Sequence, residues 1–394
     1  MSVLFIVALV IFGYETVSLI LPLKISVFWK VVCSALLLIG SFKNTLFQQF
    51  GGGMFFAPDL PYWVMLSGAL LYNLLIVALF LSVVKDAVWL LWKICNLLGI
   101  CRRAYPADKA SLTVLALAAV LTVYGTWEAL RVPDVERHDV FIPNLPQEFE
   151  GKKIALLVDL HASALNRRPL IQAIVEKTNA LLPDIVLMPG DFVDGLLRDR
   201  KDDLEPLKLL RVPLGVWGAS GNHEYYSGYE DWMKQLTEWG VTMLENRHVV
   251  LTSGNGQLVI AGVPDQQGTR FGFAAPDVEK ALRGAPPGVP VILMAHRPET
   301  AAESAEAGVS LQLSGHTHGG MMPILDSIVA RFNGGYVRGW YDVGPMKLYV
   351  SRGTSLWNGF PMRLFDPAEI TLLVLQGPVN RGDGIRKYPR QGMP

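Results

Sequence analysis

Five short apolar runs in the C-terminal two-thirds of the chain each end in a tight turn that carries aspartate, asparagine or histidine. The runs are rich in aliphatic residues and have the length of buried strands. Helical patterns fall between several of them, for example over 168–182 and 229–239. Strands that alternate with helices predict an α/β fold, in which sites gather at the carboxyl ends of the strands. We therefore expect the five turns to meet at one place.

The histidines of the chain gather in these turns, which hold five of the seven. One histidine in a turn is most simply a core or surface residue, but five at equivalent strand ends, accompanied by acids, indicate a metal site. Gly190, Gly221 and Gly315 precede three of the turns' polar residues, where glycine permits a positive φ and close backbone approach. The polar residues are Asp159, His161, Asp191, Asp194, Asn222, His223, His296, His316 and His318.

The mixture of imidazole, carboxylate and amide oxygen selects the kind of metal. It suits Mn²⁺, Fe or Zn²⁺ and argues against a thiolate site or an all-oxygen calcium site. The ligands are too many for one catalytic ion, and they suit two ions that share a bridging carboxylate. We expect two divalent ions, with manganese favoured, that clamp a phosphoryl group and activate a water between them.

The five turns read D-L-H at 159–161, G-D-F-V-D at 190–194, G-N-H-E at 221–224, His296, and G-H-T-H at 315–318. In type and order they resemble the calcineurin-like metallophosphoesterase family, whose pattern is D-x-H, G-D-x-x-D, G-N-H-E/D, H, G-H-x-H. The resemblance covers about residues 150–375. It implies an α/β metallophosphoesterase domain over residues 151–376, with two β-sheets sandwiched between helices and a two-metal site at one edge.

The resemblance also implies a role for each residue, and the reaction would be attack on phosphorus by a metal-bridged hydroxide. Asp191 would bridge the two ions. His223 would contact the phosphate and protonate the leaving oxygen. Asp194 would orient His223, or alternatively cap a helix or turn, and Glu224 would be structural. Six further residues would hold the ions, three each: Asp159, His161 and His318 for the first, and Asn222, His296 and His316 for the second.

Within the family, the residues after His296 and the stretch from Tyr349 to Leu375 resemble a bacterial, membrane-associated branch of phosphodiesterases. That branch usually has glutamine where this chain has Met321. Residues 321–332 are unusually apolar, which predicts either a lip that faces lipid or substrate, or an ordinary packed loop or short amphipathic helix. Arg297 and Met321 are the candidate substrate-binding residues.

The first 128 residues are far more apolar than the rest. They hold eight Lys and Arg and five acidic residues, whereas the remainder of the chain holds 27 and 30. Four apolar stretches are long enough to predict four transmembrane helices, and hence a membrane domain over 1–128. The stretches are 3–23, 27–41, 62–84 and 110–127.

The segments between and after these stretches predict further features. Near 85–105, tryptophans between charges predict an amphipathic helix in the membrane interface. Residues 129–150 predict a linker or first strand, and 377–394 a flexible tail. Glu15, an acid inside a predicted span, indicates either a functional carboxylate in the bundle or a structural or interfacial one.

Charge distribution predicts the orientation and limits the partners. Five Lys and Arg between residues 85 and 109 place that loop in the cytoplasm. The catalytic domain would then lie on the extracytoplasmic, periplasmic side of a bacterial inner membrane, which the chain crosses several times. The slightly acidic C-terminal part has no basic stripe, which argues against nucleic acid. The bilayer and a phosphoester substrate are the expected partners, and nothing indicates an obligate protein partner.

These observations favour a membrane-anchored two-metal phosphoesterase that acts on a phosphodiester of a lipid-linked or envelope substrate. Two alternatives remain. The domain could be a membrane sensor or scaffold that binds a ligand without turnover. It could also be a tethered hydrolase of soluble nucleotides or phosphomonoesters, with the membrane part serving only as an anchor.

Overall fold

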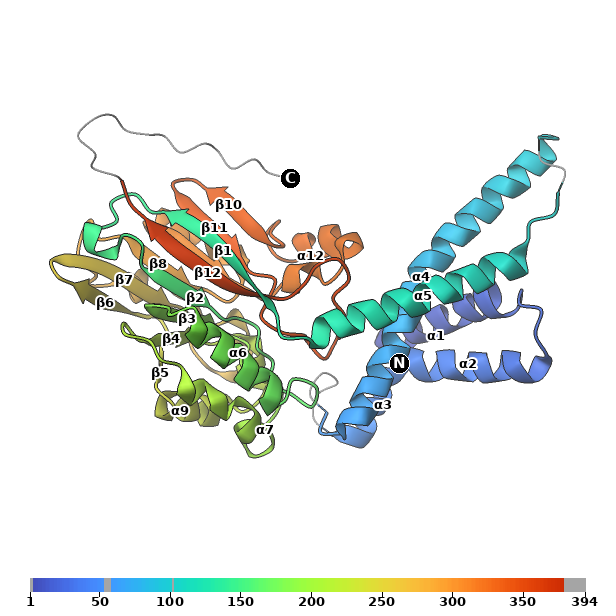
Figure 1. Cartoon of the computed structure of the whole chain (residues 1–394), viewed down its shortest axis with the longest axis horizontal. Helices are drawn as coiled ribbons and strands as arrows, with labels where there is room; N and C mark the ends of the chain where they lie inside the picture. Colours follow the sequence, from blue (N-terminus) through green and yellow to red (C-terminus); the bar gives the residue numbers. More distant parts are fainter. Residues whose placement is uncertain (1–2, 53–57, 101–102, 379–394) are drawn as a thin grey trace.

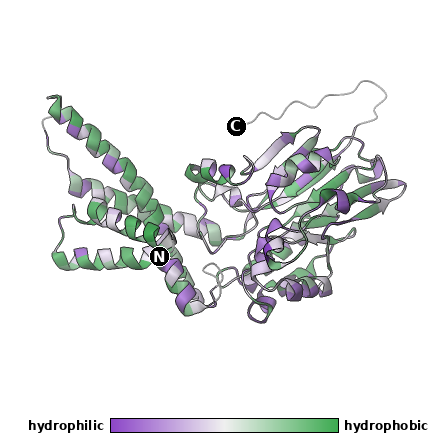
Figure 2. Ribbon diagram, turned by 180° about the vertical axis from the view of Figure 1, so that it is seen from behind, coloured by the Kyte–Doolittle hydropathy of each residue, from purple (hydrophilic) through white to green (hydrophobic). Residues whose placement is uncertain are grey.

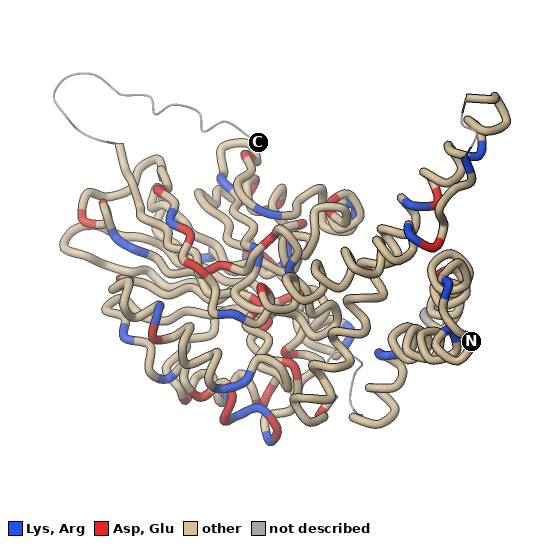
Figure 3. Tube along the Cα trace, turned by 45° about the vertical axis from the view of Figure 1, so that its right-hand side comes forward, with Lys and Arg blue, Asp and Glu red and all other residues tan. Residues whose placement is uncertain are grey.

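The protein has an N-terminal helical region and an α/β sandwich that lies against one end of it (Figure 1). The structure is a computed structural model that describes residues 3–52, 58–100 and 103–378. The helical region is hydrophobic over most of its length (Figure 2), whereas Lys, Arg, Asp and Glu gather on the sandwich (Figure 3). The uneven charge distribution of the sequence therefore corresponds to two structural regions.

The sandwich consists of two six-stranded mixed sheets, with strand orders β1-β12-β2-β3-β4-β5 and β10-β11-β9-β8-β7-β6. Strands β2 to β5 are parallel, as are β7, β8, β9 and β11. The strands are β1 Asp134–Phe141, β2 Lys153–Leu156, β3 Ile185–Pro189, β4 Val216–Ala219, β5 Val241–Met243, β6 Arg247–Ser253, β7 Gly256–Gly262, β8 Val291–Met294, β9 Leu311–Ser314, β10 Gly339–Val343, β11 Met346–Val350 and β12 Glu369–Gln376.

Alternate side chains of each central strand enter different cores. In β2, Ile154 and Leu156 pack between the sheets, while Ala155 packs under the outer helices. Helices cover both outer faces, which confirms the predicted α/β sandwich of two sheets between helices. The helices of the sandwich are α6 Arg168–Ala180, α7 Leu197–Leu204, α8 Asn222–Tyr226, α9 Tyr229–Glu238, α10 Val278–Leu282, α11 Ala301–Glu306 and α12 Asp326–Arg331.

The prediction of four transmembrane helices is wrong. Among the described residues, two helices are long and apolar enough to cross a membrane, or three if a pair bent by 64° counts as one span. The first predicted span is only a short apolar helix that ends before Pro22. The helices are α1 Val3–Glu15 with the π-helical turn η1 Thr16–Ile20, the bent pair α2 Val27–Ser41 and α3 Lys43–Gly51, and the long α4 Tyr62–Leu97 and α5 Ala107–Leu130.

The predicted interfacial helix near 85–105 is not a separate element, because α4 continues through the charged residues to Leu97. No proline interrupts this stretch. Its first two charged side chains, Lys85 and Asp86, form hydrogen bonds inside the helical bundle. Lys85 donates to the carbonyl oxygen of Ser18 at 2.8 Å, and Asp86 accepts from the Ser18 hydroxyl at 2.6 Å. Lys85 is thus a bundle residue rather than a loop residue. Residues 101–102 of the predicted segment lie outside the described residues.

Three smaller predictions concern Glu15, the C-terminal tail and the segment between the two regions. Glu15 is fully buried in the helical region, where the Ser82 hydroxyl lies 3.4 Å from one carboxylate oxygen. It therefore faces the bundle interior rather than an interface. The predicted tail at 377–394 lies outside the described residues from 379 onward. Part of the predicted linker at 129–150 forms β1, which pairs in parallel with β12.

Candidate metal centre

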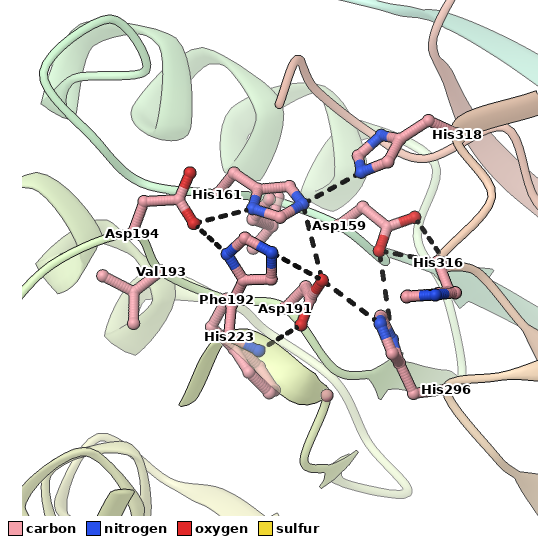
Figure 4. A network of polar contacts seen from close by, with 12 residues as sticks. Asp159, His161, Asp191, Phe192, Val193, Asp194, His223, His296, His316 and His318 are labelled. Atoms are coloured by element: carbon pink, nitrogen blue, oxygen red, sulfur yellow. Dashed lines mark hydrogen bonds and ion pairs between the residues drawn. The ribbon is translucent and has the colours of Figure 1, made fainter. Parts of the chain in front are cut away.

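The five turns meet at one edge of the sandwich, as the sequence predicts (Figure 4). They follow the carboxyl ends of β2, β3, β4, β8 and β9, which parallel pairing within each sheet brings to the same edge. All the predicted ligands are buried except His316, which is half-buried. The two histidines left out of the prediction, His138 and His248, lie on β1 and β6, outside these turns.

Asp159, His161 and His318 form one ligand group, with one ligand atom from each within 4.8 Å of the others. The Nε2 atoms of His161 and His318 are only 3.0 Å apart. Both rings therefore direct a nitrogen at the same place, and two imidazoles with a carboxylate are a usual ligand set for a divalent ion. This group therefore fits a metal ion.

Asp191, His296 and His316 form a second group within the same 4.8 Å limit. One oxygen of Asp191 (Oδ2) lies 3.2 Å from Nε2 of His296 and 3.6 Å from Nε2 of His161, so this carboxylate faces both groups. Burial acts to raise the pKa of Asp191, but His296 and His223 outweigh burial and hold the pKa well below its usual range.

Asn222 supplies an independent indication that a cation fits here. Its Oδ1 atom is buried and has no hydrogen-bond partner in the described residues. Such an orphaned oxygen costs free energy unless it binds something, and an amide oxygen is a suitable ligand for a divalent ion. Asn222 begins α8 directly after β4, next to the ligand turn that carries Asp191.

His223 and Asp194 form a buried pair, with Nδ1 of His223 2.5 Å from Oδ1 of Asp194. Burial acts to lower the pKa of His223, but the carboxylates of Asp191 and Asp194 outweigh burial and raise the pKa to about 9. The same Asp194 oxygen also lies 2.9 Å from Nδ1 of His161. Asp194 therefore orients a ligand of the first group as well as His223, a second role that the sequence pattern does not indicate.

The backbone of several candidate ligands lies in the left-handed region. Five of the candidate ligands have a positive φ, a conformation that costs about 1–3 kcal/mol for a residue other than glycine. Gly190 also has a positive φ, 95°, and a Cβ there would meet the backbone nitrogen of Gly221 at 2.4 Å. Gly221 and Gly315 lack a positive φ and instead allow close approach to neighbouring carboxylates. The five strained ligands are Asp159 (56°), His161 (42°), Asp191 (54°), His316 (70°) and His318 (49°).

Glu224 holds two ligand turns together through their backbone. Its fully buried carboxylate accepts hydrogen bonds from the backbone N–H groups of Asp191, Phe192 and Gly221 at 3.0, 2.7 and 2.7 Å. It therefore fixes the turn after β3 against the turn after β4. This is the structural role expected for Glu224.

Two site residues were not predicted individually, although both lie in the stretch 349–375 that carries part of the resemblance. Arg363 is 1% exposed and donates to the carbonyl oxygen of His318 at 2.6 Å, and its guanidinium lies 3.1 Å from Nδ1 of the same histidine. Burial, together with His161 and Arg363, holds the pKa of His318 well below its usual range. Trp357 stacks on His318 and meets the ring of His223 edge-on.

The two candidate substrate-binding residues lie next to the ligand turns. Arg297 follows His296, and its Nε donates to Asp265 at 2.7 Å. Met321 is half-buried, with a φ of 63°, and its carbonyl oxygen accepts from the backbone N–H of Leu364 at 3.0 Å. Met321 thus connects the turn of His318 to the stretch that carries Arg363.

That stretch also packs against the helical region. Asn73 of α4 donates to the carbonyl oxygen of Pro361 at 2.8 Å, and Lys43 of α3 donates to that of Asn358 at 3.2 Å. The backbone N–H of Arg363 bonds the carbonyl oxygen of Gly125 in α5 at 2.9 Å. Residues 355–366, which we call the coupling loop, therefore contact the candidate metal centre on one side and three helices on the other.

Comparison with known proteins agrees with this geometry. The model of the calcineurin-like phosphoesterase family matches residues 152–320. A transmembrane protein with a metallophosphoesterase domain from Danio rerio is 33% identical over 335 residues, which cover 82% of this chain and 76% of that protein. Uncharacterized metallophosphoesterases of Campylobacter jejuni and Aquifex aeolicus are 34% and 32% identical, covering 68% and 67% of this chain and 69% and 99% of theirs.

These relatives come from an animal and from bacteria, so they do not single out the bacterial branch. The match to the Danio rerio protein covers more of this chain than the sandwich contains, and it therefore reaches into the N-terminal helices. The fold is that of metal-dependent phosphoesterases, and its His and Asp residues form a candidate dinuclear site. The chain belongs to the calcineurin-like metallophosphoesterase family.

Proposed function

We propose that this protein is a membrane-anchored two-metal phosphoesterase that hydrolyses a phosphodiester of a lipid-linked or envelope substrate. The observation that carries the reaction is the pair of ligand groups that Asp191 faces, with the His223–Asp194 pair beside them. The contact between the coupling loop and the helices supports a substrate that reaches the site from the membrane.

Each ligand group would hold one divalent ion, with manganese favoured: Asp159, His161 and His318 the first, and Asn222, His296 and His316 the second, with Asp191 facing both. Bound there, two cations would activate a water and neutralise the charge of the phosphoryl oxygens.

The remaining side chains would bind and protonate the substrate. Nδ1 of His223 is held by Asp194, and Nε2 would donate a proton to the departing alcohol. Arg297 would bind a phosphoryl oxygen with the guanidinium nitrogens that Asp265 leaves available. Met321 would contact the apolar part of the substrate.

A turnover assay separates an enzyme from a sensor or scaffold. The full-length protein in detergent with Mn²⁺ is expected to hydrolyse bis(p-nitrophenyl) phosphate, and Asp191→Asn to lower this rate by about 100-fold or more, since even the partners behind metal ligands are worth 10–100-fold. Asp342→Asn is the matched control, because Asp342 is exposed on β10. Wild-type turnover no greater than that of Asp191→Asn would rule out the enzymatic function.

Substrate preference separates the lipid-linked substrate from the tethered-hydrolase alternative. Faster hydrolysis of nucleotides or phosphomonoesters than of lipid phosphodiesters would favour the alternative.

For orientation, we propose an extracytoplasmic sandwich. The loop between α4 and α5 lies at the opposite end of the helical region from the sandwich (Figure 1). An alkaline phosphatase reporter fused in that loop, after residue 105, should therefore be inactive, and an active fusion would reverse the orientation.

A further inference from the structure

The segment that leaves the His318 turn has an apolar face without a protein partner among the described residues. After Met321 the chain forms the short turn Pro323–Leu325 and then α12. One side of this segment packs into the helical region, where Met322 and Leu325 join a cluster with residues of η1, α4 and α5. The other side exposes three large apolar side chains, and Phe365 of the coupling loop is exposed beside them. We call these four residues the α12 surface: Ile324 (55% exposed), Ile328 (55%), Phe332 (72%) and Phe365 (66%).

The α12 surface continues the apolar surface of α5. The rings of Phe365 and Tyr124 are in contact, with centroids 6.1 Å apart. Along α5, Val120 and Val123 are 66% and 64% exposed, as expected for side chains that face lipid rather than protein. The apolar surface therefore extends from a helix long enough to cross a membrane onto the segment that follows a candidate metal ligand.

The end of α5 indicates the depth of this surface. Tyr124 and Trp127 are the aromatic residues that membrane proteins place at the level of the lipid headgroups. The Arg131 guanidinium lies over the ring of Trp127, 5.7 Å from its centroid, and marks the return to a polar environment. Because Phe365 touches Tyr124, the α12 surface lies at headgroup level, and the exposed Arg331 at its end suits anionic headgroups.

We propose that the α12 surface is a membrane-contact surface that enters the bilayer beside α5 and holds the candidate metal centre against the lipid headgroups. Of the two possibilities that the sequence left open for residues 321–332, this is the lipid-facing lip. This surface has a consequence for catalysis, which rests on the proposed function. A phosphoester anchored in the bilayer would reach the site without leaving the membrane plane.

Fluorescence quenching tests the contact without any need for catalysis. In full-length protein with Cys33, Cys95 and Cys101 replaced by serine, a single Ile328→Cys is labelled with an environment-sensitive fluorophore and reconstituted into nanodiscs of phosphatidylcholine and phosphatidylglycerol. Lipids brominated on the acyl chain are expected to quench this label. The control is Leu182→Cys, which is 75% exposed and precedes β3 at the opposite edge of the sandwich. Equal quenching at both positions would overturn the proposal. Crosslinking of Ile328→Cys to a second copy of the chain, with no quenching by the brominated lipids, would overturn it as well.

Two probes with the same leaving group test the consequence for catalysis. The triple variant Ile324→Ser, Ile328→Ser, Phe332→Ser should hydrolyse bis(p-nitrophenyl) phosphate at the wild-type rate, because all three side chains are exposed and lie outside the coupling loop. It should hydrolyse the p-nitrophenyl ester of phosphatidic acid in nanodiscs about 10-fold more slowly, because three apolar anchors are lost. An unchanged ratio of the two rates would refute delivery from the bilayer. Failure of the wild-type protein on both probes would refute the proposed function, while quenching would still report the contact.

Discussion

At the residue scale, the His223–Asp194 pair predicts how the rate depends on the leaving group. Asp194 holds Nδ1 of His223, and in the proposed function Nε2 protonates the departing oxygen. A positioned general acid is worth about 10²–10⁴-fold, and its worth falls as the leaving group becomes more acidic. His223→Ala should therefore slow methyl phenyl phosphate by this factor and methyl p-nitrophenyl phosphate by much less. Both rates are measured at saturating Mn²⁺.

The control for this prediction is His248→Ala, because His248 lies on β6 and bonds only the carbonyl oxygen of Ala281 among the described residues. Metal content by mass spectrometry should be the same in both variants. An equal loss of rate on the two esters would show that His223 does not act as an acid on the leaving group.

The unsatisfied ligand atoms predict that metal removal destabilises the protein. Without cations, Oδ1 of Asn222 has no hydrogen-bond partner among the described residues, and five candidate ligands keep a strained positive φ. Ligand binding to the folded state adds about 4 kcal/mol at a thousandfold excess over Kd. A chelator should therefore lower the Tm of the full-length protein in nanodiscs, and Asp191→Asn should show a smaller decrease. A Tm that does not respond to the chelator would argue against resident ions.

At the element scale, Glu224 predicts an effect on the stability of the fold, in keeping with the structural role expected for it. Its carboxylate accepts three backbone N–H groups from the turns after β3 and β4. Glu224→Gln must turn an amide NH₂ toward at least one of these donors, and a buried group left unsatisfied costs about 1–3 kcal/mol. Denaturant unfolding of the full-length protein measures the loss. Glu303→Gln, on the exposed side of α11, is the control, and equal stability of the two variants would refute the role.

The sandwich could be predicted from sequence because local patterns and long-range topology agree there. A buried strand such as β3 shows a run of apolar residues, and Asp191 follows it in a turn that Gly190 makes possible. Parallel pairing then brings successive strand ends to one edge without further information. The second bond of Asp194, to His161, was not predictable, because it depends on side-chain positions across two turns.

The helical region was harder to predict because its breaks depend on distant partners. The bend between α2 and α3 comes just before Lys43, whose ammonium bonds the carbonyl oxygen of Asn358, a residue 315 positions away. The continuation of α4 past Lys85 likewise depends on a bond to Ser18. Hydropathy describes how apolar a stretch is, and it does not report which polar group satisfies a charge inside a bundle.

At the scale of the whole molecule, the coupling loop connects the helices to the candidate metal centre. Asn73 holds Pro361, and two residues further on Arg363 bonds both the carbonyl oxygen of His318 and that of Ser355. Partners that orient metal ligands contribute to metal affinity although they do not touch the ion. If the helices served only as an anchor, changes within them would leave the metal affinity unaltered.

Asn73→Leu tests this coupling. The fully buried Asn73 donates to Thr126 at 2.9 Å and to Pro361 at 2.8 Å, and leucine has a similar volume but cannot donate. The Pro361 carbonyl then loses its donor, the coupling loop shifts, and Mn²⁺ affinity should fall by about 10–100-fold, the usual effect of removing a partner behind a ligand. Calorimetric titration of the metal-free protein in nanodiscs measures it. Asn96→Leu is the matched control, since Asn96 is exposed near the far end of α4. Wild-type Mn²⁺ affinity in Asn73→Leu would show that the helices serve only as an anchor. A loss of affinity in this variant and not in Asn96→Leu would show that the helices contribute to the metal centre.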